Sequence, residues 1–276
     1  MLMQRYAEVL SIAAVVCCLA ASGARAQSLS TEAERIQLLR AQIRTAEEQH
    51  QGAAEAGGLW LRLANRYQDQ FDVAEAEDAF ARSLHLLRGT GMQTEYADAL
   101  AGLGSVYLVT GRLSEAKNSL RKSLAIYQTL SDRVHAAQLH NTIALVLLSE
   151  RRYRESEAES SEALRDLQSL ASPDVREVVA AYLTHSYAVC YQGRCTAALD
   201  DANRAMAVVQ ARLPAESLEM AAVRLVRGFD QWRAGSPEEG EHAIREALRI
   251  ARELKDLPRP ALVNAQLGML RHTQRC

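Results

Sequence analysis

The chain has 276 residues, of which 48 % are hydrophobic, 24 % are charged and 5 % are aromatic. Its 32 basic and 34 acidic side chains are interspersed and nearly cancel, so the formal net charge is −2. This balance gives no support for nucleic acid or an anionic membrane as the main partner. The length is sufficient for a substantial core, and the low proline content favours helices.

The first 26 residues have the pattern of a cleavable signal peptide. A weakly charged leader precedes an apolar run from Val9 to Ala21, and small residues follow, with Ala24 and Ala26 in the A-x-A spacing. This order is typical of a secretory signal, and cleavage after Ala26 would leave Gln27 first. An uncleaved anchor is the alternative, but the apolar run is short for a bilayer span. We therefore expect an exported chain, in the bacterial periplasm.

Segments at both ends of the mature chain are expected to lie outside the main repeats. Residues 27–56 are predicted to form a leading helix, because Ile36, Leu39 and Ile43 fall on one side of it. Residues 256–276 are predicted to supply a closing helix and the C-terminal tail. End helices of this kind shield the terminal apolar faces of a repeat array.

Between these ends, in residues 57–255, a pattern of small and large residues recurs five times. The similar segments begin at residues 63, 103, 143, 185 and 227, so the period is 40 to 42 residues. A fixed spacing in this range indicates a solenoid. Three columns of the alignment hold small residues throughout, and small residues at matching points let two helix backbones approach closely. The columns are Ala64, Gly104, Ala144, Ser186 and Gly228; Ala76, Ala116, Ser156, Ala198 and Gly240; and Ser83, Ser123, Ala163, Ala205 and Ala247.

The second segment, LGSVYLVTGRLSEAKNSLRKSL, begins at Leu103 and resembles the tetratricopeptide repeat family. It places the small residue Gly104 three positions before Tyr107 and puts Gly111 in the turn. The period exceeds the common 34 residues and is similar to that of the long-helix variants in kinesin light chains and bacterial regulatory proteins. The resemblance implies an all-α fold, a right-handed α-solenoid of stacked antiparallel helix hairpins.

Two glycines lie inside the first helix of this segment, although each costs about 1 kcal/mol there relative to alanine. Gly104 is explained by its small-residue column. Gly102 belongs to no such column and, by the family analogy, lies near the inner surface. It is therefore the glycine that could serve ligand access instead of packing.

The sequence contains no recognisable catalytic or phosphate-binding motif. A phosphate loop, a dinucleotide fingerprint, an H-E-x-x-H and a C-x-x-C are all absent. His185 falls in a core column, so we expect a hydrogen-bonded structural role for it rather than that of a ligand or base. We accordingly expect no enzymatic activity, no metal site and no cofactor.

Three cysteines remain after the predicted cleavage: Cys190, Cys195 and Cys276. Cys190 lies late in the first helix of the fourth repeat, and Cys195 lies just past the turn. A disulfide across this turn is conceivable if the Cα atoms come within about 7 Å, and two free thiols are the alternative. Cys276, the last residue, is expected to be exposed, where it could pair with another molecule.

In the resembling family, the first helices of successive repeats line a concave groove that usually binds an extended peptide or a helix of a partner. For this sequence the resemblance implies a groove that is polar at its N-terminal end, aliphatic in the middle and aromatic at its C-terminal end. Aromatic side chains are frequent hot spots of interfaces, although packing between repeats is the alternative for each of them. The implied groove residues are Asn65, Gln68, Leu108, Asn141, Leu145, Leu148, Leu183, Tyr187, Tyr191, Phe229, Trp232 and Arg233.

The sequence thus predicts a non-catalytic, exported interaction scaffold that binds a protein or peptide in its groove. No nucleic acid and no stable membrane insertion after signal cleavage are expected. A structural or assembly protein that self-associates through its terminal repeats is the alternative hypothesis.

Overall fold

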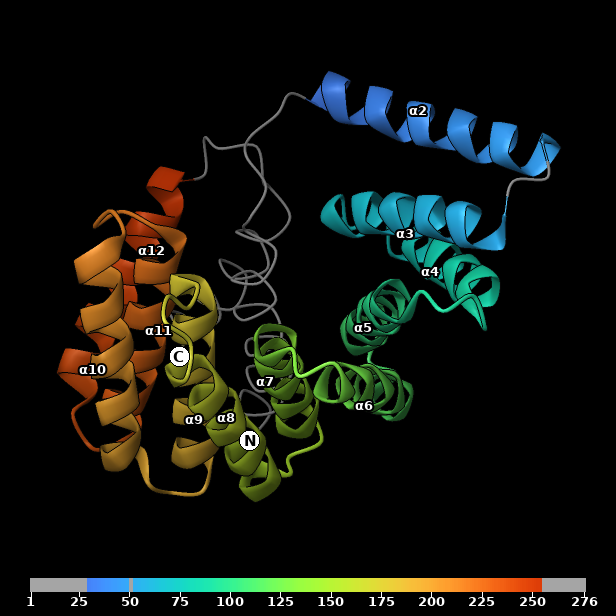
Figure 1. Ribbon diagram of the computed structural model, residues 1–276. Helices are drawn as coiled ribbons and strands as arrows, with labels where there is room; N and C mark the ends of the chain where they lie inside the picture. Colours follow the sequence, from blue (N-terminus) through green and yellow to red (C-terminus); the bar gives the residue numbers. More distant parts are fainter. Residues whose placement is uncertain (1–28, 50–51, 255–276) are drawn as a thin grey trace. The chain divides into compact units, whose positions relative to one another are not determined.

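The computed structural model describes residues 29–49 and 52–254, which are helical apart from short turns and contain no strand (Figure 1). The predicted signal peptide and closing helix lie outside these residues. Within them, no helix has the length and apolar character that crossing a membrane requires. The helices are α2 (Leu29–Glu48), α3 (Ala53–Asp69), α4 (Val73–Leu87), α5 (Gln93–Val109), α6 (Leu113–Thr129), α7 (Arg133–Ser149), α8 (Tyr153–Gln168), α9 (Val175–Tyr191), α10 (Cys195–Arg212), α11 (Leu218–Arg233) and α12 (Pro237–Glu253).

The chain forms two compact units, and the boundary between them falls inside α7. The N-terminal unit comprises residues 25–139, and the C-terminal unit begins at His140. In the N-terminal unit, α3 pairs with α4 and α5 pairs with α6; in the C-terminal unit, α9 pairs with α10 and α11 with α12. Each pair is joined by a short turn, so the fold is the predicted all-α array of antiparallel hairpins.

The leading helix is shorter than the sequence predicted. α2 ends at Glu48, and α3, the first helix of repeat one, begins at Ala53, so residues 53–56 belong to the repeats. The residue before α3 is Gly52, whose backbone lies outside the helical region, with φ −58° and ψ 145°. This extended conformation is incompatible with a continuous helix, and it marks the residue from which α3 starts.

The predicted apolar side of this leading helix is confirmed. Ile36 and Ile43 are buried, and Leu39 packs against the same core. That core includes Leu59 and Leu63 of α3. The helix thus covers an apolar face of the first hairpin, as expected for the end of a repeat array.

All three predicted columns of small residues are buried. Where a column holds serine, the hydroxyl donates a hydrogen bond to a carbonyl of the partner helix. Ser83 donates to the carbonyl oxygen of Gly57 at 2.9 Å, and Ser123 donates to that of Ala97 at 2.8 Å. The hydroxyl groups are therefore satisfied within the close helix contact, which removes the penalty for burying them.

Both glycines of α5 are packing residues. A Cβ on Gly104 would lie 2.6 Å from the Cγ of Leu120 in α6, which confirms the predicted close contact. A Cβ on Gly102 would overlap the ring of Phe80, which is fully buried in α4. The suggestion that Gly102 serves ligand access is therefore wrong, because the phenylalanine ring takes the space that a side chain would need.

The last hairpin has a close backbone contact between Gly228 of α11 and Gly240 of α12. A Cβ on Gly228 would lie 2.7 Å from the carbonyl oxygen of Gly240, and a Cβ on Gly240 would lie 2.6 Å from that of Gly228. Backbone atoms cannot swing aside as side chains can. Any larger residue therefore forces the two helices apart.

We expect Gly228→Ala to destabilise the protein by about 1–3 kcal/mol through this overlap. Gly58→Ala is the matched control, because Gly58 also lies inside a helix but a Cβ there would meet nothing within 4 Å. The control should be stabilising by up to about 1 kcal/mol, the helix propensity difference. Urea unfolding followed by circular dichroism checks both, and equal effects of the two substitutions would contradict the packing role.

The turns inside the hairpins share one backbone feature. In each of the five repeats, the residue eight positions after the start of the similar segment has a positive φ. These residues are Phe71 at 62°, Gly111 at 76°, Arg151 at 61°, Gly193 at 86° and Gly235 at 99°. The amide of the residue that follows donates to a carbonyl five residues earlier in every case. This is the Schellman arrangement that ends helices, and its left-handed position favours glycine.

Substitutions at left-handed positions should change stability in opposite directions. Gly111→Ala should lower the free energy of unfolding by about 1 kcal/mol, because a Cβ is strained at this φ. Ser131, an exposed residue with φ 57° between α6 and α7, already carries such a strain. Ser131→Gly should therefore raise the free energy of unfolding by a similar amount, and thermal unfolding of both variants tests the pair.

Candidate functional site

In the N-terminal unit, the predicted groove residues differ in exposure. Asn65 on α3 is exposed and Gln68 on the same helix is half-buried. Leu108 on α5 is buried, with 4 % of its surface exposed, whereas its neighbour Val109 is 54 % exposed. The surface predicted here is therefore polar, as expected, but Leu108 contributes to the interior.

The predicted aliphatic middle of the groove is buried. In the C-terminal unit, Leu145 and Leu148 of α7 and Leu183 of α9 each have 3 % or less of their surface exposed. The whole run 143–148 is buried, because α7 is apolar on every side there and offers no polar face to solvent. This corrects the prediction of an open aliphatic surface at these residues. Asn141 is also buried, and its Oδ1 has no hydrogen-bond partner among the described residues.

The predicted aromatic end is brought together in the C-terminal unit. Tyr191 of α9 stacks on Tyr153 of α8 with ring centroids 5.1 Å apart, and it lies 5.5 Å from the ring of Phe229 of α11. Tyr187, one turn earlier in α9, lies 6.2 Å from Tyr191 and 5.7 Å from Phe229. We call these four residues the aromatic cluster. It joins side chains from three consecutive repeats.

Two further predicted residues lie at the edge of the aromatic cluster. The guanidinium of Arg233 lies 5.7 Å from the ring centroid of Tyr191 and 5.8 Å from that of Phe229, a cation–π geometry. No carboxylate of the described residues forms a salt bridge with Arg233. Trp232, the preceding residue in α11, is 57 % exposed. Tyr187 itself is buried, while Tyr191 and Phe229 are half-buried, so the cluster has a buried floor and a partly open edge.

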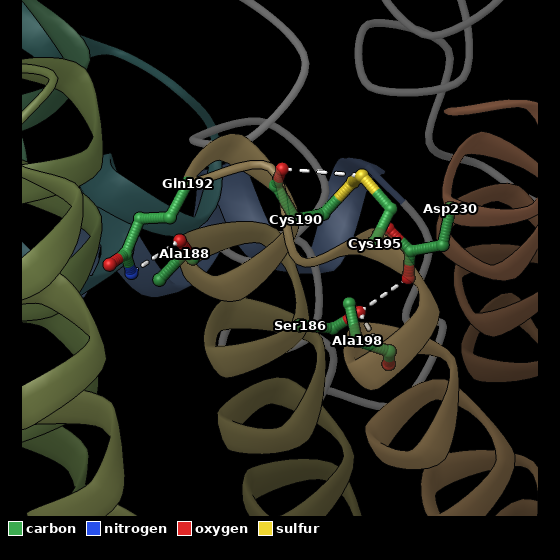
Figure 2. Close-up of a disulfide and its surroundings, with 7 residues drawn as sticks. All are labelled: Ser186, Ala188, Cys190, Gln192, Cys195, Ala198 and Asp230. Atoms are coloured by element: carbon green, nitrogen blue, oxygen red, sulfur yellow. Dashed lines mark hydrogen bonds between the residues drawn. A yellow bond between two sulfur atoms is a disulfide. The ribbon is translucent and has the colours of Figure 1, made fainter. Parts of the chain in front are cut away.

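A disulfide closes the turn that carries Tyr191 (Figure 2). It joins Cys190, near the end of α9, to Cys195, the first residue of α10, and the two Cα atoms lie 3.9 Å apart. Of the two alternatives for this pair, the structure therefore has the bridge and not two thiols. Because Tyr191 lies inside the bridged loop, the bond restricts the backbone that presents its ring.

Glu157 of α8 contacts two residues of the same turn. Gln192 donates hydrogen bonds to Glu157 at 2.7 Å and to the carbonyl of Ala188 at 2.9 Å, and Arg194 pairs with the same glutamate. Burial raises the pKa of Glu157, but the donors Gln192 and Arg194 outweigh it and hold the pKa below its ordinary value. Glu157 is thus a charged anchor for the turn.

A buried polar network lies behind the disulfide, between α9, α10 and α11. His185 Nδ1 lies 2.7 Å from Asp201 Oδ2, so this histidine is hydrogen-bonded, as predicted. Ser186 Oγ lies 2.5 Å from Asp230 Oδ2 and 3.1 Å from the carbonyl oxygen of Ala198 (Figure 2). Asp230 is fully buried, and its Oδ1 has no hydrogen-bond partner among the described residues.

The electrostatics of this network favour the neutral form of Asp230. Burial raises its pKa to about 7, and the nearby charge of Asp201 adds to the rise. The hydrogen bond from Ser186 and the positive charge of Arg233 oppose it. Near neutral pH the carboxyl group therefore exchanges between its acid and its ionised form.

The comparisons with known proteins agree with this hairpin geometry. Residues 97–137 match the family model of the tetratricopeptide repeat. This match spans most of the α5–α6 hairpin, and the other hairpins share the geometry of its turn. No curated protein matches the sequence.

Solved structures with similar folds cover most of the chain. BtubC (BKLC) from P. vanneervenii superposes with a TM-score of 0.63 at 18 % identity, covering 84 % of this chain and 92 % of that protein. The TPR-like repeats of a putative kinesin light chain from Podospora anserina give 0.57 at 16 %, covering 71 % and 95 %. The Rap conjugation gene regulator of the plasmid pLS20, solved with the Phr* peptide, gives 0.59 at 15 %, covering 78 % and 62 %. Similarity at these identities shows the fold.

Tyr153 is the member of the aromatic cluster that the sequence analysis missed. It is the first residue of the second helix of its tetratricopeptide-type repeat, a position that other repeats fill with Val73, Leu113, Cys195 and Pro237. This column is apolar throughout, and that pattern could have identified it as a contact position across the turn.

Asp230 should make the stability of the protein fall as the pH rises. In the unfolded chain an aspartate has a pKa of about 3.9, so between about pH 4 and pH 7 the unfolded state releases a proton that the folded state keeps. The free energy of unfolding therefore decreases through this window, and the loss is complete above the folded-state pKa of about 7. Asp230→Asn should abolish the slope and add about 4 kcal/mol at pH 8, measured by urea unfolding.

Asp200→Asn is the control for this experiment, because Asp200 is an exposed carboxylate on the same α10 that carries Asp201. It should leave the pH dependence of the parent protein unchanged. Equal slopes for the parent and the Asp230→Asn protein would show that Asp230 is not the titrating group.

Proposed function

We propose that this protein is an exported, non-catalytic scaffold that binds a partner peptide or protein at the edge of its aromatic cluster. The observation that carries the proposal is the cation–π arrangement of Arg233 over Tyr191 and Phe229, with Trp232 exposed beside it. Tryptophan, tyrosine and arginine are the residues that dominate binding energy at protein interfaces.

The chemistry of this edge suits a peptide-like ligand. Tyr191 and Phe229 offer half-buried ring surface that loses little conformational entropy on binding, since both rings are already packed. Arg233 has five N–H donors, and stacking on the rings leaves them available to carboxylate or carbonyl oxygens. The Rap regulator that shares this fold was solved with a peptide, which makes peptides the first class of ligand to test.

Two features support export. The first 26 residues have the signal pattern described above, and the Cys190–Cys195 disulfide is of the kind that persists in oxidising compartments. An exported scaffold with a covalently closed recognition turn would be stable outside the cytoplasm. Localisation by fractionation of the native host, with the chain found in the periplasm, is the expected result.

The buried polar network favours a structural role over catalysis. Ser186 is bonded to Asp230 and Ala198, whereas the neighbouring His185 is bonded to Asp201. A nucleophilic serine would need a hydrogen bond to the imidazole and access to a substrate, and Ser186 is fully buried. The network therefore lacks the geometry of a serine–histidine relay.

Truncation at the edge of the aromatic cluster should weaken peptide binding. Peptides selected from a random displayed library against the parent protein should lose at least about tenfold in affinity, or about 1.4 kcal/mol, for Trp232→Ala and for Arg233→Ala. Isothermal titration calorimetry measures the change.

Leu38→Ala and Arg245→Ala are the controls, since Leu38 on α2 and Arg245 on α12 are exposed and lie on other helices. Both should bind like the parent. If the selected peptides bind the Trp232 and Arg233 variants with the affinity they have for the parent, the proposal is wrong. Light scattering of the free protein separates it from the alternative of self-association, which requires a mass that rises with concentration.

A further inference from the structure

Asp230 connects the buried polar network to the aromatic cluster. In α11 it directly follows Phe229 and lies three residues before Arg233, so the side chains of Asp230 and Arg233 are neighbours on the helix surface. The carboxyl group of Asp230 contacts Ser186 of α9 (Figure 2). Asp230 therefore belongs to the buried polar network and lies, in α11, between two residues at the aromatic cluster.

The hydrogen-bond geometry around Asp230 favours its protonated form. Ser186 Oγ lies within hydrogen-bond distance of two oxygens, Asp230 Oδ2 at 2.5 Å and the carbonyl oxygen of Ala198 at 3.1 Å. A hydroxyl group has one proton and can donate to one of them. With Asp230 protonated, its O–H donates to Ser186 Oγ, and Ser186 donates to Ala198, so both contacts are satisfied.

Ionisation of Asp230 removes one proton from this series of hydrogen bonds. A fully buried carboxylate is then left with one shared donor and with Oδ1 unpartnered, which is strongly unfavourable without a nearby positive charge. On α9 and α10, His185 is already bound to Asp201, which is itself a like charge. On α12, Glu239 accepts a hydrogen bond from Gln231, the residue that follows Asp230, and supplies no positive charge.

Arg233 is the cation whose charge reaches Asp230. In the structure its guanidinium lies over the rings of Tyr191 and Phe229. These stacking contacts are weaker than an ion pair with a buried carboxylate. The arginine is therefore free to exchange one partner for the other.

We propose that the proton on Asp230 controls the position of Arg233 and thereby the state of the partner-binding edge. With Asp230 neutral, Arg233 lies over the aromatic cluster. With Asp230 ionised, Arg233 turns to the carboxylate and the cluster loses its cation. The consequence for ligands rests on the proposed function, but the movement of Arg233 is testable without a partner.

Trp232 provides the reporter, because it is exposed and directly precedes Arg233. The chain has 2 tryptophans, and the other one is Trp60 of the N-terminal unit. In a Trp60→Phe background, the emission maximum and acrylamide quenching of Trp232 should follow a single titration between pH 5 and pH 9, centred near the Asp230 pKa of about 7.

Three variants in this background decide the proposal. Asp230→Asn should hold the signal at its low-pH value throughout, since the amide can donate to Ser186 without ionising. Ser186→Ala should move the midpoint to higher pH, because the hydroxyl group binds the ionised carboxylate more strongly than the neutral acid, and its loss therefore costs the ionised form more. Asp200→Asn should titrate like its parent.

No transition in the parent, or a transition that persists unchanged in Asp230→Asn, would overturn the inference. If Asp230→Asn fails to fold, the midpoint shift of Ser186→Ala decides in its place. A Trp232 titration, together with peptide binding that Trp232→Ala and Arg233→Ala leave unchanged, would support the proton control and refute the proposed function, so the two failures are distinguishable.

Discussion

The backbones of paired helices approach each other where both carry small residues, and the rest of each repeat is arranged around that contact. Gly228 and Gly240 show the limit, where a single Cβ would reach a backbone oxygen. At this separation, hydroxyl groups of serines reach across to carbonyls, and rings such as Phe80 fit against a bare glycine. The distance between helices is thus set by the smallest residues, and the large residues fill what remains.

Because the hairpins are held at fixed spacing, side chains from neighbouring repeats meet in a predictable order near the turns. The aromatic cluster is one result, since Tyr153, Tyr191 and Phe229 come from three repeats and depend on the stacking of α8, α9 and α11. The disulfide around Tyr191 and the anchor Glu157 add local rigidity to the same place. A rigid, partly exposed ring surface beside an arginine is preorganised for recognition, while the neighbouring Asp230 makes it sensitive to protonation.

The sequence was sufficient to predict the repeats, their period and the small columns, because these follow from spacing. The family resemblance assigned Tyr187, Tyr191, Phe229 and Arg233 to the same end of the repeats, but their contacts became known only from the structure. The sequence was insufficient where the exposure of a residue depends on a side chain from another helix. Gly102 looked like a groove residue because Phe80 lies 22 positions away in sequence and its ring position is a tertiary property. Leu145, Leu148 and Leu183 were assigned to the groove by position in the repeat, but their exposure depends on what packs over them, which a pattern does not encode. The leading helix is shorter than predicted, because the backbone is extended at Gly52 and α3 begins at the next residue.

The bridged turn has a meaning beyond its own repeat. Its two cysteines occupy positions that repeats two and three fill with Leu108 and Leu113 and with Leu148 and Tyr153. All these turns share the left-handed residue and the hydrogen bond to the carbonyl five residues earlier. Repeat four therefore carries a covalent bond at two positions that repeats two and three fill with leucine or tyrosine. The array therefore offers a series of equivalent places for engineered cystines, by which single repeats could be locked one at a time.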